Sequence, residues 1–352
     1  MEPEAVQFLK LLLETPSPSG FEEQVQDLYL NWIKAQVSKS YKDVHGNAFG
    51  VVNPGGKVKV MLSGHCDEVG LMVKYIDDQG YIYFSSVGGI DPQITQGMRV
   101  TIVGASGLVP GVIGKKPIHL QEQEERNKVV KLDGQWIDIG ASNREQALKI
   151  VQVGDPVVIN LGFQELLEQR VAARGIDDRI GTFVVAEVLK KVDSAKLQCA
   201  VFGVSTVQEE LGLRGAKTSA FGIKPQIGIA IDLTFSADCP EVNKKMVGDI
   251  SLGKGPVIAR GPNINPLLYR RLVQVAEEHN LPYQVQAESR ATGTDANVIQ
   301  ITREGVATGL VSIPSRYMHS PSEIIDLQDV ENAISLLVFF LESLSPEESW
   351  IP

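Results

Sequence analysis

The chain places histidines and carboxylates directly after apolar runs or at turns. Because open α/β sheets bind ligands at the carboxyl ends of their strands, such side chains are expected to gather at one edge of a sheet. Taken one at a time, each is better explained as a surface charge or as a core histidine. Together, His, Glu and Asp at three strand ends make an open catalytic metal site an equally good explanation. The residues concerned are His65, Asp177, Glu209, Glu210, Asp232 and His319.

The tripeptide His65-Cys66-Asp67 follows the first of these apolar runs. A metal-bound histidine usually donates its second ring N–H to a carboxylate or a carbonyl, which determines its tautomer. Asp67 is therefore expected to orient His65. Cys66, between them, is better explained as a small buried apolar side chain than as a ligand.

The adjacent acids Glu209 and Glu210 could have two different roles at a metal site. One carboxylate can coordinate a metal while the other faces its water, whose pKa the metal lowers to about 7. The second carboxylate can then accept the water proton and pass it to a leaving group. A solvated acidic turn is the alternative, although two glycines and an isolated arginine within residues 206–215 make it less attractive.

The elements that must position these residues alternate between apolar strands and amphipathic helices. Continuous apolar strands alternating with helices are typical of an α/β fold with a mostly parallel sheet covered by helices on both faces. Strands are expected at residues 57–63, 197–206, 226–231 and 306–313, and helices at 5–13, 21–37, 182–191, 267–279 and 327–344.

The sequence pattern changes between residues 74 and 163. Short β-rich runs alternate there with turn residues, and the only helical pattern is a short one at 144–149. This pattern is typical of a small β-barrel or sandwich. We therefore expect a catalytic domain formed by residues 1–73 and 164–352, interrupted by a small β-barrel-like domain at 74–163.

Composition excludes several classes of protein. The 352 residues include 33 basic and 43 acidic side chains, a net charge of −10 that argues against nucleic-acid binding. The acidic N-terminus lacks the basic region of a signal peptide, and no apolar run is long enough to span a membrane, so no membrane partner is expected. Three cysteines form no CxxC pair and favour a cytoplasmic location. Serine-hydrolase, P-loop and dinucleotide-binding motifs are missing from the sequence.

Several ordered motifs occur along nearly the whole chain. They are His65-Cys66-Asp67-Glu68-Val69-Gly70, Gly175-Ile176-Asp177-Asp178-Arg179-Ile180-Gly181, Thr206 to Ala216, Ile231-Asp232-Leu233-Thr234, Gly293-Thr294-Asp295-Ala296 and Arg316 to Glu323. Together they resemble the motif series of the dinuclear metallo-aminopeptidases of the glutamyl-aminopeptidase, tetrahedral (TET) type. Some members of that family are named endoglucanases or cellulases. Residues 88–93, 111–117 and 136–142 are similar to the family's second domain.

The resemblance implies a role for each matching residue. Asp177 would bridge two metals, His65 and Asp232 would complete one site, and Glu210 and His319 the other. The general base would be Glu209, with Asp67 orienting His65. The implied cofactors are two divalent ions, Zn or Co, and the implied partners are peptides and further copies of the chain, in dimers that build a dodecamer through the inserted domain.

The resemblance implies that the protein releases N-terminal amino acids from peptides. Thr294 and Asp295 are candidate substrate contacts. Three alternatives remain open at this stage. One is a deacylase or carboxypeptidase on the same scaffold, which would hold a different end of the substrate. Another is an endoglucanase, and the last is a non-catalytic binding protein that retains the scaffold. The His and carboxylate ligands suit Zn, Co or Mn alike.

Overall fold

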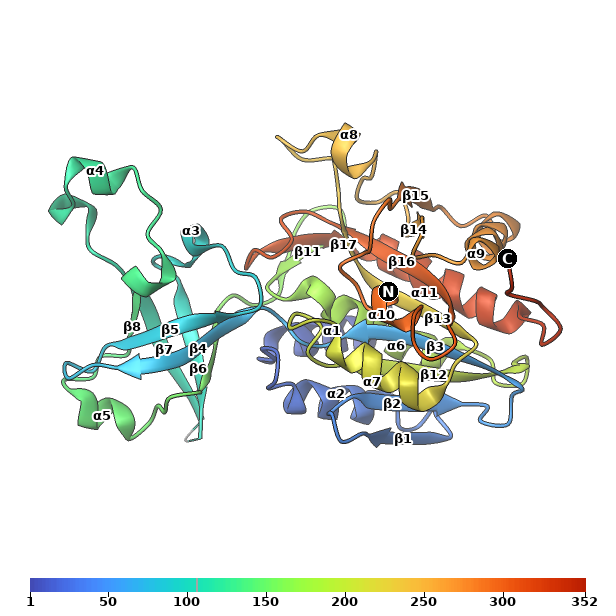
Figure 1. Ribbon diagram of the computed structural model, residues 1–352, viewed down its shortest axis with the longest axis horizontal. Helices are drawn as coiled ribbons and strands as arrows, with labels where there is room; N and C mark the ends of the chain where they lie inside the picture. The colour runs from blue at the N-terminus through green and yellow to red at the C-terminus, as the bar shows by residue number, and fades with distance from the viewer. Residues whose placement is uncertain (106) are drawn as a thin grey trace.

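The computed structural model describes residues 1–105 and 107–352, which form an α/β body and a smaller β-barrel beside it (Figure 1). The body is built on one eight-stranded sheet. Its strands lie in the order β1 (Lys39–Lys42), β2 (Ala48–Val52), β12 (Cys199–Thr206), β3 (Val58–His65), β13 (Ile227–Phe235), β16 (Ala307–Ser315), β14 (Val257–Arg260) and β15 (Gln284–Ala287).

The interior of this sheet is parallel, and each flank joins it through an antiparallel pair. Strands β12, β3, β13 and β16 run parallel to one another, whereas β2 pairs antiparallel with β12, and β14 pairs antiparallel with β16. The interior strands are buried along almost their whole length, as expected when helices cover both faces. The predicted fold class is therefore confirmed, with antiparallel additions at both edges.

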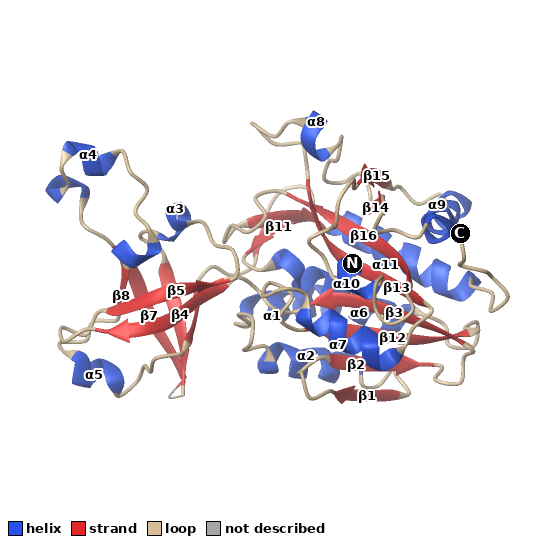
Figure 2. Cartoon of the chain, in the orientation of Figure 1, coloured by secondary structure: helices blue, strands red, loops and turns tan. Residues whose placement is uncertain are grey.

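Helices cover the two faces of the sheet unequally (Figure 2). The larger core packs α1, α2, α6, α9 and α11 against the sheet, while α7 and α10 cover a smaller apolar cluster that includes Phe49, Met61 and Ile299. Asn265 and Asp326 cap α9 and α11 by accepting backbone N–H hydrogen bonds. The helices of the body are α1 (Pro3–Glu14), α2 (Glu23–Ile33), α6 (Ile176–Lys191), α7 (Arg214–Ile223), α8 (Lys244–Val247), α9 (Pro266–Glu278), α10 (Ala296–Ile299) and α11 (Leu327–Ser343).

The smaller unit is a closed antiparallel barrel with its own apolar core, separate from that of the sheet. Its first strand begins at Gly70, four residues before the start expected for the insert. The barrel strands, in order around it, are β4 (Gly70–Ile76), β5 (Ile82–Val87), β8 (Trp136–Asp138), β7 (Gly107–Gly114), β6 (Arg99–Gly104) and β9 (Pro156–Ile159). Its helices are α3 (Pro92–Thr95), η1 (Ile118–Leu120), α4 (Gln123–Arg126), η2 (Leu132–Gly134) and α5 (Arg144–Leu148).

A three-stranded sheet lies between the barrel and the body and joins distant parts of the chain. It contains β10 (Gln164–Glu165), β11 (Arg170–Ala173) and β17 (Glu323–Asp326), all antiparallel. The pairing brings Ala173, just before α6, opposite Glu323, just before α11. In residues 1–105 and 107–352, each helix is either too short or too polar to cross a bilayer.

Strand β3 and helix α6 approach each other closely at Gly64, one residue before His65. The Gly64 carbonyl accepts a hydrogen bond of 3.1 Å from the Thr182 hydroxyl. A Cβ atom on Gly64 would overlap the backbone of Gly181 and Thr182, which cannot rotate away as a side chain could. The absence of a side chain at this position therefore sets the spacing between strand and helix.

Substituting Gly64→Ala is expected to lower the free energy of unfolding by about 1–3 kcal/mol, because added volume in a packed interior forces backbone shifts. The measurement is urea unfolding followed by circular dichroism. Gly55→Ala is the matched control, since a Cβ there meets no heavy atom within 4 Å. Equal unfolding midpoints for the two variants would show that the close approach at Gly64 is unimportant.

Candidate metal centre

The carboxyl ends of the central strands deliver most of the side chains singled out in the sequence. His65 is the last residue of β3, and Glu209 and Glu210 follow the end of β12. The position of Asp232 differs from the prediction that it follows the end of a strand at residues 226–231. Asp232 lies inside β13, because that strand continues to Phe235 in register with β16. His319 lies in the loop between β16 and β17, and Asp177 lies at the start of α6.

These side chains form two clusters in which the candidate ligand atoms lie within 4.8 Å of one another. One cluster contains His65, Glu209 and Asp232, and the other contains Asp177, Glu210 and His319. Asp177 connects them. One of its carboxylate oxygens lies 3.3 Å from Nε2 of His65 and the other lies 3.3 Å from Nε2 of His319.

Glu209 is close enough to the first cluster to be counted among its ligands. Its Oε2 lies 3.7 Å from Nε2 of His65, and the side chain is only 8 % exposed. Glu210 faces the other cluster, with Oε1 3.5 Å from Nε2 of His319. The two adjacent acids therefore face different clusters, one on each side of the Asp177 carboxylate.

Burial, together with the concentration of negative charge, raises the pKa of several of these carboxyl groups. Burial, followed by the charge of Asp232, raises the pKa of Glu209 to about 10. Burial and the charge of Asp177 raise the pKa of Glu210 to about 7 and also raise the pKa of Asp232. For His65, burial opposes protonation, but the nearby carboxylates outweigh it and raise the pKa. Positive charge would thus stabilise the site.

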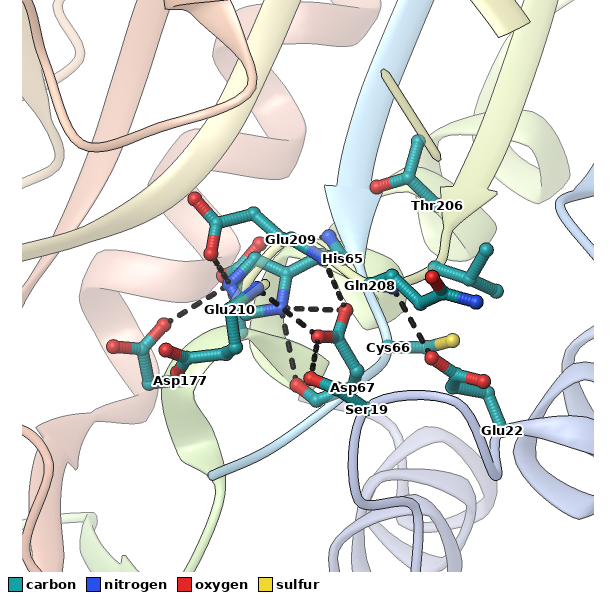
Figure 3. A network of polar contacts seen from close by, with 12 residues as sticks. Ser19, Glu22, His65, Cys66, Asp67, Asp177, Thr206, Gln208, Glu209 and Glu210 are labelled. Atoms are coloured by element: carbon teal, nitrogen blue, oxygen red, sulfur yellow. Dashed lines mark hydrogen bonds and ion pairs between the residues drawn. The ribbon is translucent and has the colours of Figure 1, made fainter. Parts of the chain in front are cut away.

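Asp67 holds both the histidine and the Glu pair in position (Figure 3). Nδ1 of His65 donates to the Asp67 backbone carbonyl at 3.0 Å, and it lies 3.4 Å from the Asp67 carboxylate. The same carboxylate accepts the backbone N–H groups of Glu209 at 3.0 Å and Glu210 at 3.1 Å, and it accepts the Ser19 hydroxyl. The contact with Glu209 and Glu210 was not anticipated from the sequence.

Four consecutive backbone N–H groups, those of residues 207–210, each donate to a side-chain oxygen from another segment. Asn47 Oδ1 accepts from Val207 at 3.1 Å, and Glu22 Oε1 accepts from Gln208 at 3.1 Å. Asp67 accepts the other two. Glu22 also accepts the Gly20 N–H at 2.7 Å (Figure 3 shows Glu22 and Gln208 in contact). The first four residues of the loop that carries the Glu pair are thereby attached to other segments of the chain.

On the other side of the centre, Glu323 has a role similar to that of Asp67. Its carboxylate accepts the backbone N–H of Asp177 at 3.0 Å and that of His319 at 2.8 Å. Asp178, which is fully buried, accepts the backbone N–H of His65 at 3.1 Å. The sequence motifs contained both residues, but only the fold reveals that they hold the candidate ligands.

The centre opens into a cleft of about 450 Å³ that is lined by residues of both clusters. Of the two candidate substrate contacts, Thr294 lines this cleft and Asp295 does not. The Asp295 carboxylate is 2 % exposed and accepts the Thr206 hydroxyl at 2.7 Å, so Asp295 supports the site from behind.

The donor atoms fit divalent cations. Imidazole nitrogens and carboxylate oxygens are ligands for Zn and for related transition-metal ions. The imidazole of His65 is already oriented through its other ring nitrogen, as is usual for a metal-bound histidine. The residues present therefore suit a pair of neighbouring cation sites that share the Asp177 carboxylate.

Comparison with known proteins identifies relatives along almost the whole chain. Residues 46–336 match the model of the M42 glutamyl aminopeptidase family. The chain is similar to the lysyl aminopeptidase of Pyrococcus furiosus, with 38% identity over 343 residues that cover 97% of both chains.

Solved structures of similar proteins share the fold. The TET aminopeptidase from the marine sediment archaeon Thaumarchaeota archaeon SCGC AB-539-E09 superimposes with a TM-score of 0.93 at 31% identity, covering 98% of this chain and 97% of that one. The Pyrococcus horikoshii TET1 peptidase, which can assemble into a tetrahedron or a large octahedral shell, gives 0.87 at 32% identity over 97% and 100%.

A Thermotoga maritima protein named endoglucanase also has this fold, with a TM-score of 0.77 at 30% identity over 95% of this chain and 96% of that one. The resemblance noted in the sequence is thus confirmed, including its endoglucanase-named members. With a family model that spans most of the chain and an aminopeptidase relative at 38% identity, the chain belongs to the M42 glutamyl aminopeptidase family and is a peptide hydrolase.

Proposed function

We propose that the protein is a dinuclear metallo-aminopeptidase that releases N-terminal amino acids from peptides. The observation that carries this proposal is the position of Asp177, whose two carboxylate oxygens each lie 3.3 Å from a different histidine. A carboxylate in that position could bridge two cations, with one oxygen bound to each. The other members of the two clusters, apart from Glu209, then supply the remaining ligands of the two cations.

In this proposal His65 and Asp232 complete one site, and Glu210 and His319 complete the other. Two divalent cations, Zn or Co, would supply Lewis acidity that polarises the scissile carbonyl and lowers the pKa of the attacking water. Asp67 keeps the ring of His65 oriented through the hydrogen bond at Nδ1.

Glu209 is the general base in this mechanism. It lines the cleft beside the centre, within reach of a water or a substrate atom bound there. The two cations would keep its carboxylate ionised by offsetting the negative charge around it. The carboxylate then accepts a proton from the attacking water and returns the proton to the leaving amine, which makes the departing peptide a good leaving group. The hydrogen bonds to residues 207–210 keep this carboxylate in place during both transfers.

We further propose that residues 1–73 and 164–352 form the catalytic domain and that the insert at 74–163 carries the contacts of dimers that assemble into a dodecamer. Leu108, Ile118 and Leu120 of the insert are 61%, 59% and 68% exposed, which is apolar surface suited to contacts between copies. Large assemblies of the Pyrococcus horikoshii TET1 peptidase support this proposal. Three free cysteines support a cytoplasmic location.

Replacing the proposed base, Glu209→Gln, should lower kcat by at least about 10²-fold because the amide cannot accept the proton. The variant should retain both metals, measured by elemental analysis after gel filtration. Glu304→Gln, at an exposed position, is the control and should behave like the parent. Parental activity in Glu209→Gln would refute the base assignment, and loss of one metal would make Glu209 a ligand.

Removing the metals should abolish hydrolysis of aminoacyl-p-nitroanilides, and adding back Zn or Co should restore it. An N-acetylated substrate should resist the enzyme, because an aminopeptidase needs the free α-amine. Turnover of N-acetylated peptides would favour a deacylase or carboxypeptidase. Activity on a β-glucan that survives both chelation and Glu209→Gln would favour an endoglucanase.

Glu22 is expected to support catalysis through the loop that carries Glu209. Glu22→Ala leaves the partly buried N–H of Gln208 without its acceptor, a loss of about 1–3 kcal/mol. We expect kcat to fall about tenfold or more, with KM little changed. Glu22→Gln keeps an acceptor oxygen and should recover most of the activity, and Glu23→Ala, at the exposed neighbouring position, is the control. Equal activity in Glu22→Ala and Glu23→Ala would contradict this role.

A further inference from the structure

Three buried charged residues lie beside the centre without belonging to either cluster. They are Glu68, Arg174 and Arg179, which are 2%, 6% and 0% exposed. Glu68 and Arg174 also line a small cavity of about 30 Å³ together with all three members of the cluster that contains Asp177. Unpaired charges are costly to bury, so the partners of these three side chains show which segments they hold together.

Glu68 pairs with both arginines. Its carboxylate accepts hydrogen bonds from Nη1 of Arg174, from Nη2 of Arg179 at 3.0 Å and from the backbone N–H of Ser17 at 3.0 Å. Burial opposes ionisation of Glu68, but the two guanidinium groups outweigh it and lower the pKa of the carboxyl group. Glu68 is therefore ionised at neutral pH and acts as the shared counter-charge of two buried cations.

Arg179 uses its remaining donors on backbone carbonyls of two segments. Its Nε donates to Gly175 at 2.8 Å, and its Nη2 donates to Arg174 at 3.0 Å. Its Nη1 donates to Leu12 at 3.0 Å and to Thr15 at 2.6 Å, at the C-terminal end of α1. The guanidinium therefore joins the end of α1 to the residues that lead into α6.

The two carbonyls that Arg179 holds in α6's approach lie shortly before Asp177. Gly175 packs against the network so closely that a Cβ atom there would overlap the Arg179 guanidinium and lie 2.8 Å from Oε2 of Glu68. The Asp177 N–H itself donates to Glu323 at 3.0 Å. The backbone that carries Asp177 is therefore fixed by Arg179 before this residue and by Glu323 at it, which keeps the carboxylate between the two histidines.

Glu68 also connects this backbone to the other cluster. It follows Asp67, whose carboxylate accepts the N–H groups of Glu209 and Glu210. The Glu68 N–H donates to the Ser17 carbonyl at 3.0 Å. Glu68 thus joins the loop after β3, through its backbone, to the start of α6, through its side chain. A displacement between these two elements would change the distance between the clusters.

We propose that Glu68 and Arg179 are positioning residues for the metal centre: Glu68 holds the Arg179 guanidinium, and Arg179 fixes the two carbonyls that set where Asp177 lies. Neither side chain would contact a cation or the substrate. The inference rests on the proposed function, because it assigns Asp177 to both cations. Arg174 is the natural comparison, since its guanidinium also pairs with Glu68 but donates to the Glu14 carbonyl and not to the backbone just before Asp177.

The first test is a titration with cobalt(II), followed by visible absorption. Arg179→Lys keeps a positive charge beside Glu68, but an ammonium group cannot reproduce the planar set of donors that holds the carbonyls. At least one cobalt ion should therefore bind about tenfold or more weakly, as is usual when a group that orients a ligand is lost. Arg174→Lys makes the same change beside the same carboxylate and should bind both ions as the parent does. Equal cobalt affinities in the two variants would overturn the positioning role.

Glu68→Gln should weaken cobalt binding to a similar extent, because Arg179 then lacks its counter-charge. Glu187→Gln is the matched control, since it neutralises another buried carboxylate, which accepts the Trp32 indole N–H towards the other end of α6. Circular dichroism verifies that each variant is folded during the titration. Parental cobalt binding in folded Glu68→Gln would show that Glu68 serves stability alone. If Glu68→Gln does not fold, the comparison of the two lysine variants decides.

The second test needs no metal. Hydrogen exchange of the metal-free protein, followed by mass spectrometry, should be about tenfold faster in Arg179→Lys for peptides that cover residues 174–178, because loss of the carbonyl contacts lets this segment open more often. Arg174→Lys should exchange like the parent. Equal exchange in the parent and both variants would overturn the proposal. Fewer than two cobalt ions bound per parental chain would instead refute the dinuclear centre, and the exchange rates alone would then decide the positioning role.

Discussion

Repulsion among buried carboxylates is the constraint on which the rest of the structure depends. Asp177, Asp232, Glu209 and Glu210 converge within two clusters, and burying unpaired charge is costly. The pKa values of Glu209 and Glu210 are raised accordingly, to about 10 and about 7. A fold can hold such a group together only if other interactions prevent the side chains from turning away.

Two further acids supply much of that restraint, through the backbone. Asp67 accepts the N–H groups of Glu209 and Glu210, and Glu323 accepts those of Asp177 and His319. Each therefore fixes two candidate ligand positions without approaching the ligand atoms themselves. A carboxylate that receives two N–H groups gains charge-assisted hydrogen bonds that offset part of its own desolvation.

The sequence was sufficient to predict the apolar strands that reach the site, because burial on both faces leaves a continuous apolar run. It also showed the barrel, whose short strands alternate with turns. It was not sufficient for the contacts of Glu22 and Asn47 with residues 207–208, which join segments about 160 or more residues apart. Such hydrogen bonds leave no periodic pattern in the chain. The position of Asp232 was missed by a related effect, since pairing with β16 extends β13 beyond its apolar run.

Central and edge strands hold the residues around the centre with different firmness. The two clusters depend on β3, β12 and β13, which are parallel, deeply buried and packed against α6, so small displacements there are resisted on both sides. Strand β15 is short, lies at the edge of the sheet and has mostly exposed or half-buried side chains. A substitution on that strand can change the lining of the cleft, to which Gln286 contributes, without altering the spacing between β3 and α6. The shape of the cleft can therefore vary while the strands that deliver His65 and Asp232 stay in place.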